Sequence, residues 1–386
     1  MKRICALFLT LCLLLCTAWA AAAENDGAPE VRSKAAVLME QGSGEVLFAQ
    51  HEHEKLYPAS VTKVMSLLLF LEALERGAFS PETKLAASAA AAAKGGSQIW
   101  LKEGEEMTVD ELLRATAIGS ANDACTVLAE AVSGSEESFV ALMNARAKEL
   151  GMNDTHFDNC TGLDDDTTTH LTSAYDVALM SRALLEHEKI LDYSTVWMDS
   201  LRGGQTQLVN TNKLVRHFRD TTGLKTGTTS KAGCCISASA KRGEMHLIAV
   251  VLGAENSNDR FDSAKHLLNW GFANFESVTP QVDPALISPV RVLRGAEQTV
   301  LPVADPLAPL ALRLGEKQQL TARADLPSEV EAPVEEGQML GTVTFFAGEK
   351  TVAETALRAP CGVKKLTYGD VLSRLLASLA ARTCER

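Results

Sequence analysis

A serine and a lysine three positions apart are the residues of this chain best suited to covalent chemistry. Ser60-Val61-Thr62-Lys63 is the only Ser-x-x-Lys in the sequence, and it runs into an apolar stretch from Val64 to Leu74. At a helix start the two side chains would lie on one face, one turn apart. A lysine among apolar residues favours its neutral form and can accept the serine proton, and the positive helix end would stabilise an oxyanion. Taken alone, the motif also fits a helix cap with a surface lysine.

Two further motifs offer groups that would handle a peptide substrate. Ser120-Ala121-Asn122, in a region that we expect to be helical, has a hydroxyl that can relay a proton and an amide that can hold a peptide group. Lys225-Thr226-Gly227 is expected to open a strand, where a charge and a hydroxyl suit a substrate carboxylate and the glycine lets a ligand approach the strand edge. Each motif alone is more often structural than catalytic. Their order along the chain is typical of penicillin-binding proteins and class A β-lactamases.

With these motifs the sequence resembles the serine D-alanyl-D-alanine carboxypeptidases, the low-molecular-mass penicillin-binding proteins of the S11 peptidase type. The resemblance covers nearly the whole chain and implies an α+β fold: an antiparallel sheet flanked by helices, then a small all-β domain and a short amphipathic helix. The segments that carry it are Tyr57 to Lys63, Ser120 to Ala124, Glu149 to Met152, His170 to Asp176, Gly223 to Thr229, Lys231 to Gly233 and Asn269 to Phe272.

The resemblance also implies a role for each motif residue. Ser60 would attack the carbonyl between two terminal D-alanines with neutral Lys63 as base, and Ser120 would pass a proton to the departing D-alanine. The remaining positions implied are Lys225, which would steer that proton; Asn122, on the peptide side; Thr226 and Arg260, on the free carboxylate; Gly227, in the strand; and Thr228, whose backbone N–H would form the oxyanion hole with that of Ser60. For Arg260, an exposed salt bridge is the alternative.

The implied activity is removal of the terminal D-alanine from peptidoglycan stem pentapeptides, with β-lactams as covalent inhibitors and no cofactor or metal. Thr228 and Cys234 stand where many relatives have other, often aromatic, residues. A β-lactamase would share the three motifs, but the chain lacks a Glu-x-x-Leu-Asn for rapid deacylation. A module that senses β-lactams or cell wall, becoming acylated without turnover, is a second alternative. An α/β-hydrolase is disfavoured because no Gly-x-Ser-x-Gly occurs.

Alternating strand-like and helix-like segments must position these motifs. Residues 36–39 and 46–48 flank a Gly-Ser-Gly turn and predict a hairpin, and 236–240 with 247–252 predict paired strands. Apolar periodicity predicts a buried helix over 64–74 and further helices, and from Val278 onward short alternating runs predict a small β-domain. The other predicted helices cover 111–131, 137–150, 174–185 and 263–275, and the predicted β-domain strands include 290–293, 310–314, 342–346 and 351–353.

The chain therefore divides into four predicted parts. These are a signal peptide over 1–23, a D,D-peptidase domain over 24–277, a β-rich domain over 278–365 and an amphipathic tail over 366–386. From Leu357 to the end there are six basic and two acidic side chains, so the tail could contact an anionic membrane or pack on its own β-domain. The leader has a basic start, an apolar core and small residues at its end, which is typical of cleavage after export, although an uncleaved anchor is possible.

The composition of the chain bears on where the protein is located and on which functional classes are excluded. The 386 residues are 46% hydrophobic, enough for two or three domains with packed cores. A net charge of −12 argues against nucleic-acid binding, and eight histidines without a His-Glu-x-x-His or Cys-x-x-Cys pattern argue against a metal site. The enzyme is expected outside the cytoplasmic membrane, periplasmic or extracellular. The six cysteines beyond the leader could be buried thiols or bridges, and Cys234 and Cys235 should point to opposite faces of a strand.

Overall fold

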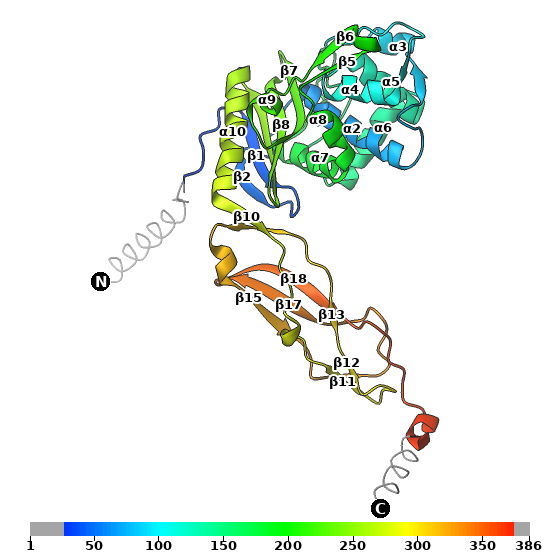
Figure 1. The fold of residues 1–386 in the computed structure, drawn as a ribbon, viewed down its shortest axis with the longest axis vertical. Coiled ribbons are helices and arrows are strands. Elements are labelled where there is room, and N and C mark those ends of the chain that lie inside the picture. Colours follow the sequence, from blue (N-terminus) through cyan, green and yellow to red (C-terminus); the bar gives the residue numbers. More distant parts are fainter. Residues whose placement is uncertain (1–26, 374–386) are drawn as a thin grey trace, which may run out of the picture.

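The computed structural model describes residues 27–373, so the predicted leader and the tail beyond residue 373 lie outside the described residues. Figure 1 shows two bodies arranged end to end along the long axis, which we call the N-terminal body (residues 27–274) and the C-terminal body (residues 275–373). The first combines a sheet with helices and the second consists mainly of strands, which confirms the predicted α+β class. Within residues 27–373, every helix is too short or too polar to span a lipid bilayer.

A five-stranded antiparallel sheet forms the centre of the N-terminal body. The predicted N-terminal hairpin lies beside strands that come some 200 residues later, because β1 pairs along its whole length with β9. All six residues of β1 are buried, and its side chains alternate between two hydrophobic cores, one on each face of the sheet. The strand order is β2 (Val46–Gln50), β1 (Ala35–Glu40), β9 (Met245–Ala254), β8 (Gly233–Arg242) and β7 (Thr221–Thr229), so that β7 is an edge strand.

Helices cover both faces of this sheet (Figure 1). α10 (Ser257–Asn274) packs on β8 and β9, with buried side chains in the smaller core. The larger core lies on the opposite face, under a group of helices around α2. These helices are α2 (Lys63–Glu75), α3 (Ala89–Ala92), α4 (Val109–Ala117), α5 (Asn122–Ser133), α6 (Glu136–Glu149), α7 (Ala174–Glu186) and α8 (Leu191–Ser194), with α9 (Leu214–His217) before the edge strand.

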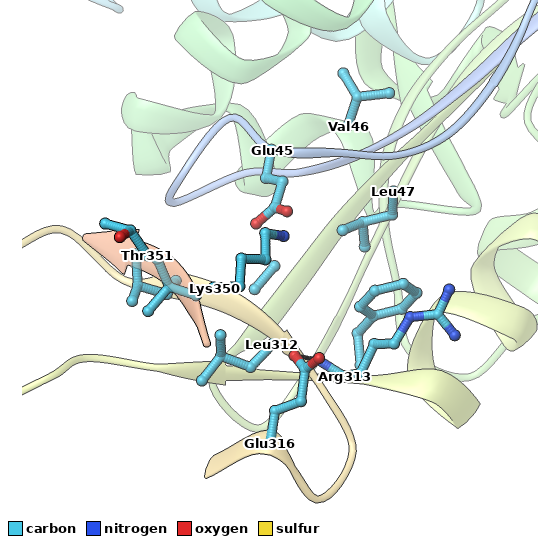
Figure 2. A pocket seen from close by; sticks show the side chains of 12 residues that line it. Glu45, Val46, Leu47, Leu312, Arg313, Glu316, Lys350 and Thr351 are labelled. Carbon is cyan, nitrogen blue, oxygen red and sulfur yellow. Dashed lines mark hydrogen bonds between the residues drawn. The ribbon is translucent and has the colours of Figure 1, made fainter. Parts of the chain in front are cut away.

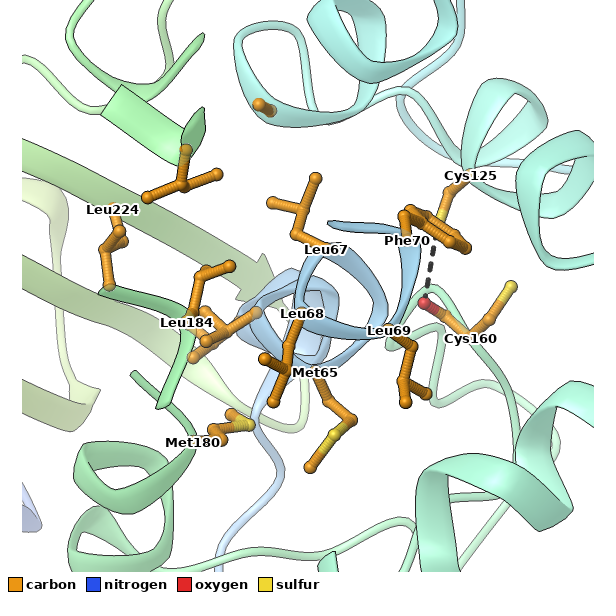
Figure 3. Close-up of a cluster of buried hydrophobic side chains, with 14 of the residues drawn as sticks. Met65, Leu67, Leu68, Leu69, Phe70, Cys125, Cys160, Met180, Leu184 and Leu224 are labelled. Carbon is orange, nitrogen blue, oxygen red and sulfur yellow. Dashed lines mark hydrogen bonds between the residues drawn. The ribbon is translucent and has the colours of Figure 1, made fainter. Parts of the chain in front are cut away.

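The helix α2 runs through the middle of the larger core (Figure 3). Ten of its thirteen residues are buried, which confirms the prediction of a buried helix over 64–74. Phe70 stacks on Phe139 of α6 with ring centroids 5.1 Å apart. Two thiols lie beside this helix: the Cys125 Sγ donates to the carbonyl oxygen of Cys160 at 3.4 Å. Because the helix is surrounded by packed side chains, its first residues are held in one position.

Three sequence predictions of local structure are wrong in detail. The single helix expected over 111–131 is two helices, α4 and α5, and Ser120 stands in the break between them with a left-handed φ of 61°. Lys225 lies in the middle of β7 rather than at its start. The helix expected from residue 263 begins at Ser257, where Asn256 caps it by accepting from the backbone N–H groups of residues 258 and 259. Apolar periodicity registers neither a break inside a buried region nor a polar first turn.

The C-terminal body is built mainly from antiparallel strands, with one parallel pair, residues 290–293 with 329–331, and it has two small apolar clusters. Its β-rich character is the one that the sequence predicts. The domain boundary predicted after residue 277 falls within β10, which pairs with β14. The strands are β10 (Phe275–Val278), β11 (Val290–Leu293), β12 (Thr299–Val300), β13 (Val303–Ala304), β14 (Leu310–Arg313), β15 (Leu320–Asp325), β16 (Glu329–Glu331), β17 (Met339–Ala347) and β18 (Lys350–Arg358).

A cavity of about 400 Å³ lies between the two bodies. Figure 2 shows Glu45 from the β1–β2 hairpin directed toward Lys350 of β18, with Glu316 and Arg313 on the other side of the cavity. Burial raises the pKa of the Glu45 carboxyl, and nearby Lys350 partly offsets the shift. The cavity is therefore a polar contact region between the bodies.

Two short hairpins lie at the end of the N-terminal body away from the C-terminal body (Figure 1). They are formed by β3 (Lys84–Ala86) with β4 (Glu106–Thr108), and by β5 (Met198–Leu201) with β6 (Thr206–Val209). Among the described cysteines, four are buried free thiols and Cys361 is an exposed one. Cys234 contributes to one core of the sheet and Cys235 to the other, which confirms their predicted opposite orientation.

Candidate active site

Ser60 and Lys63 contact each other where the chain enters α2. Ser60 lies in a short 3₁₀ turn, Ala59–Thr62, which we call the nucleophile turn. This turn leads directly into α2 at Lys63. The Lys63 Nζ is 3.0 Å from the Ser60 Oγ, as expected for side chains one turn apart. Ser60 is only partly buried, so a substrate can reach the hydroxyl, whereas Lys63 is fully buried beneath it. The pair therefore has the geometry of an accessible nucleophile with a buried base.

The Lys63 ammonium position is fixed by two more acceptors. Its Nζ donates to the Asn122 Oδ1 at 2.6 Å and to the Thr161 backbone oxygen at 2.8 Å. Burial in the protein interior nevertheless lowers the Lys63 pKa to about 8, because desolvation penalises the charged form. With this pKa, roughly a tenth of the Lys63 amine is neutral at pH 7, and this neutral fraction can take a proton from Ser60.

The break between α4 and α5 places the second motif against this pair. The α5 helix begins at Asn122, whose amide is held by a hydrogen bond from its Nδ2 to the Gly95 backbone oxygen at 2.7 Å. Ser120 is buried, and in the described part of the chain its side chain makes no hydrogen bond. The expectation that Ser120 sits inside a helix is wrong, because α4 ends at Ala117 and α5 begins only at Asn122. Ser120 lies in the break between the two helices.

The third motif lies on the edge strand β7. Lys225 is 1% exposed, and its Nζ donates to the Thr226 backbone oxygen at 2.9 Å. Burial, and then the proximity of Lys63, hold the Lys225 pKa well below its usual range. The Thr226 hydroxyl donates to the Thr211 hydroxyl at 2.7 Å. The first and third motifs therefore bring two buried lysines close enough to influence each other's ionisation.

Gly227 has a structural role that the sequence does not predict. A Cβ at this position would lie 2.8 Å from the Pro58 carbonyl oxygen and 2.8 Å from the Ser60 backbone nitrogen. The glycine therefore lets the nucleophile turn approach the strand, and its role in admitting a ligand stays a prediction. This close approach brings the Ser60 N–H beside the strand that carries Thr228.

Arg260 reaches the same end of β7 from the first turn of α10. Its Nη1 donates to the Thr228 hydroxyl at 3.0 Å and to the Gly227 backbone oxygen at 3.1 Å. The side chain is buried and makes no ion pair within residues 27–373, so the alternative of an exposed salt bridge is wrong. Its burial lowers the Arg260 pKa, although a guanidinium stays charged. A cation without an ion-pair partner in the described residues, placed beside the Thr228 hydroxyl, suits a carboxylate.

A histidine that the motif reasoning did not assign packs behind the nucleophile turn. His170 is fully buried; its Nδ1 accepts from the Asp158 backbone N–H at 3.0 Å, so its Nε2 carries the proton and donates to the Thr62 hydroxyl at 2.8 Å. Burial lowers its pKa to about 4. The adjoining loop supplies the Thr161 oxygen that Lys63 contacts, and at Gly162 a Cβ would overlap the Ala59 carbonyl oxygen. In the sequence, the family-like segment from His170 to Asp176 is the one signal that points to a role of His170 beside the nucleophile turn.

Comparisons with known proteins agree with this geometry. The family model described as D-alanyl-D-alanine carboxypeptidase matches residues 21–256, and a second, described as the C-terminal domain of penicillin-binding protein 5, matches residues 275–365. The chain is 37% identical over 384 residues to the D-alanyl-D-alanine carboxypeptidase DacF of Bacillus subtilis, covering 97% of this chain and 98% of that protein.

Solved structures show the same likeness. Penicillin-binding protein 5 from Haemophilus influenzae superposes with a TM-score of 0.80 at 29% identity, covering 87% of this chain and 99% of that one. Penicillin-binding protein D2 from Listeria monocytogenes, in its ampicillin-bound form, superposes with a TM-score of 0.58 at 30% identity over 63% of this chain and all of that one.

Proposed function

Since the chain belongs to the S11 family of D-alanyl-D-alanine carboxypeptidases, we propose that it removes the terminal D-alanine from peptidoglycan stem pentapeptides through an acyl-enzyme on Ser60. The observation that carries the proposal is the contact of Lys63 with both Ser60 and Asn122, which unites two distant motifs on one buried amine. The reaction is acyl transfer to a serine, followed by hydrolysis.

The acylation step uses the lysine as base. Neutral Lys63 takes the Ser60 proton while the hydroxyl oxygen attacks the carbonyl carbon between the two D-alanines. The resulting oxyanion accepts hydrogen bonds from the backbone N–H groups of Ser60 and Thr228, which stand near each other because Gly227 admits the nucleophile turn. The carbon–nitrogen bond then breaks, and Ser120, influenced by Lys225, gives its proton to the leaving amine while it takes the proton that Lys63 removed from Ser60, so that Lys63 is neutral again. Water hydrolyses the ester and releases the shortened peptide.

The free carboxylate of the substrate sets its orientation. We assign it to the Thr226 hydroxyl of the edge strand β7 and to the Arg260 guanidinium, which reaches the next two residues of that strand, Gly227 and Thr228, from α10. The Asn122 amide holds the peptide on the other side of the scissile bond. A β-lactam carries a comparable carboxylate and a reactive carbonyl, so it would acylate Ser60 in the same orientation. That the Listeria relative is described in an ampicillin-bound form supports binding of β-lactams.

The two alternative functions are less well supported. The family model that matches residues 21–256 is described as a carboxypeptidase, and the C-terminal body matches a domain named for a penicillin-binding protein. A β-lactamase would also need a group to activate the deacylating water, which its Glu-x-x-Leu-Asn would supply and which this sequence does not contain. A sensing module would share the geometry and differ only in turnover, so turnover is the quantity to measure.

The location follows from the substrate and the leader. We propose export across the cytoplasmic membrane with removal of residues 1–23, and peripheral contact of the basic tail with the membrane surface. At the end of the described residues, Tyr368 and Leu372 are exposed, as a membrane-contacting segment requires.

The direct test is release of D-alanine from a pentapeptide ending in D-Ala-D-Ala, together with labelling by a fluorescent penicillin. The wild-type protein should do both, and Ser60→Ala should do neither. Labelling of the wild type without D-alanine release would favour the sensing module. Activity retained by Ser60→Ala would refute the assignment of the nucleophile.

A further inference from the structure

An exposed tryptophan projects from the loop that leads from α3 to β4. Trp100 is 74% exposed, whereas its neighbours Ile99 and Leu101 are 3% and 5% exposed. Its backbone has a left-handed φ of 60°, which is rare for a bulky residue and turns the indole outward between two buried side chains. A large apolar side chain held in solvent by a costly backbone conformation indicates a binding role.

The loop around Trp100 is fixed by the same segment that carries the active-site amide. The buried Asp123 carboxylate accepts from the backbone N–H groups of Ile99, at 3.2 Å, and Leu101, at 3.0 Å. Asp123 directly follows Asn122, which contacts Lys63. The Trp100 loop is therefore joined to the catalytic base through two consecutive residues of α5, and it is held rigid by a buried charge.

Trp100 also lines a cavity of about 840 Å³ between this loop and the β5–β6 hairpin. Arg202 forms its floor, with hydrogen bonds from Nη1 to the Ile99 oxygen at 2.8 Å and from Nε to Glu105 at 2.7 Å. Gln205 and Gln207 add planar amide groups to the rim. An aromatic face combined with amide and guanidinium groups fits a ligand that has an apolar ring face and many hydroxyl or amide substituents.

We propose that this cavity binds an N-acetylated sugar of the glycan strand to which the stem peptide is attached. The proposal rests on the proposed function, because the glycan arrives only with that substrate. Four residues of extended stem peptide, those before the scissile bond, span about 13 Å, so the sugar must bind near the catalytic centre rather than far from it. The hairpins that form the cavity lie at the end of the molecule away from the C-terminal body, where a polymer has access (Figure 1).

The test compares two substrates that share one pentapeptide, one free and one attached to the disaccharide of N-acetylglucosamine and N-acetylmuramic acid. The ratio of their kcat/KM values, measured by D-alanine release, should favour the disaccharide form in the wild type. Trp100→Ala should reduce this ratio by about fivefold, as loss of a buried aromatic contact does, and Trp100→Phe should retain most of it. Gln207→Ala, a second change in the lining, should reduce the ratio by a smaller factor.

Met198→Ala is the matched control. Met198 is 57% exposed on β5 but does not line the cavity, so its loss should leave the ratio unchanged. An unchanged ratio in both Trp100→Ala and Gln207→Ala overturns the proposal. A Met198→Ala effect as large as that of Trp100→Ala overturns it as well, because the effect would then not depend on the lining of the cavity. Calorimetric binding of both substrates to Ser60→Ala keeps the sugar site testable without turnover, whereas D-alanine release from the free peptide tests the proposed function alone.

Discussion

The two bodies of the molecule differ most in what they bury. In the described part of the N-terminal body, two lysines, an arginine, two histidines and several carboxylates are buried, whereas Thr355 is the one buried polar side chain described in the C-terminal body. Burying a charge costs free energy unless its partners compensate. The N-terminal body therefore carries groups that an ordinary core would not retain, and one of them, Lys63, contacts Ser60.

This difference indicates that the N-terminal body carries out the chemistry and that the C-terminal body supports it. Lys63 and Lys225 lie close enough for each to lower the other's tendency to be charged, which a protein selected for stability alone would avoid. The C-terminal body instead has small apolar clusters and exposed ion pairs such as that of Arg358 with Asp305. Changes to the first body should thus alter rate, and matched changes to the second should alter only stability.

The largest expected effect is loss of the nucleophile. Ser60→Ala should lower kcat by roughly 10⁴-fold or more, because no covalent intermediate can form. The matched control is Thr355→Val, which removes the hydrogen bond from the Thr355 hydroxyl to the Asp305 oxygen. It should cost about 1 kcal/mol in the free energy of unfolding and leave kcat unchanged. A comparable loss of kcat in Thr355→Val would contradict the division between the bodies.

The base should be visible in the pH dependence. Lys63 must be neutral to accept a proton, so kcat/KM should rise with pH through the Lys63 pKa of about 8. Lys63→Arg keeps a positive charge but cannot give up its proton, and it should lower kcat by about 10²- to 10⁴-fold. Penicillin acylation rates measured from pH 6 to 10 provide the check. A profile that is flat in the wild type would assign the proton transfer to another group.

The support of the nucleophile turn can be tested with a pair of glycines. Gly162→Ala would push a Cβ into the Ala59 carbonyl oxygen at a φ of 86°, so the loop that carries Thr161 must move away from Lys63. We expect a loss of about 3 kcal/mol or more in the free energy of unfolding and reduced acylation. Gly337→Ala also has a positive φ, of 78°, but meets no atom within 4 Å, and should cost about 1 kcal/mol. If the two variants lost the same free energy of unfolding in denaturant melts, backbone strain rather than the clash with Ala59 would account for the loss.

Acid should weaken the N-terminal body selectively. Burial lowers the pKa of His170 and of His246 from 6.5 to about 4, so both stay neutral when folded and bind protons more readily when unfolded. The free energy of unfolding should therefore fall as the pH drops from about 6.5 to 4, by up to about 3 kcal/mol for each histidine. All eight histidines precede residue 275, so the C-terminal body has no such contribution.

Calorimetric scans at pH 7, 5 and 4 would show this as a shift of one transition. His246→Gln should reduce the pH dependence, and the exposed His266→Gln should serve as its control. If the transition of the C-terminal body shifted by the same amount, carboxylates common to both bodies would explain the acid sensitivity instead.

The sequence predicted what depends on residue type and local spacing. The Ser60–Lys63 contact follows from a three-residue spacing at a helix start, and the hairpin strands follow from alternation around a turn. It could not predict contributions made by backbone atoms or by long-range packing. The Thr161 acceptor is a carbonyl oxygen with no side-chain signal, Ser120 depends on a helix break inside an apolar region, and Gly227 depends on a turn more than 160 residues away.

The smallest expected effect lies where the two bodies meet. Burial raises the Glu45 pKa, which means that the folded protein favours the neutral carboxyl. The free energy of unfolding should therefore fall as the pH rises through the raised pKa. The attraction of Lys350 for the charged carboxylate reduces this fall. Glu45→Gln should change the free energy of unfolding by less than about 1 kcal/mol, because it removes a desolvation cost together with an attraction. Lys350→Ala should destabilise slightly, since it removes the attraction between Lys350 and the Glu45 carboxylate and leaves the repulsion from Glu316. A double-mutant cycle in calorimetry measures the coupling, and kcat should be unchanged in all three variants. A change in kcat would show that contact between the bodies reaches the active site, and that the C-terminal body does more than support it.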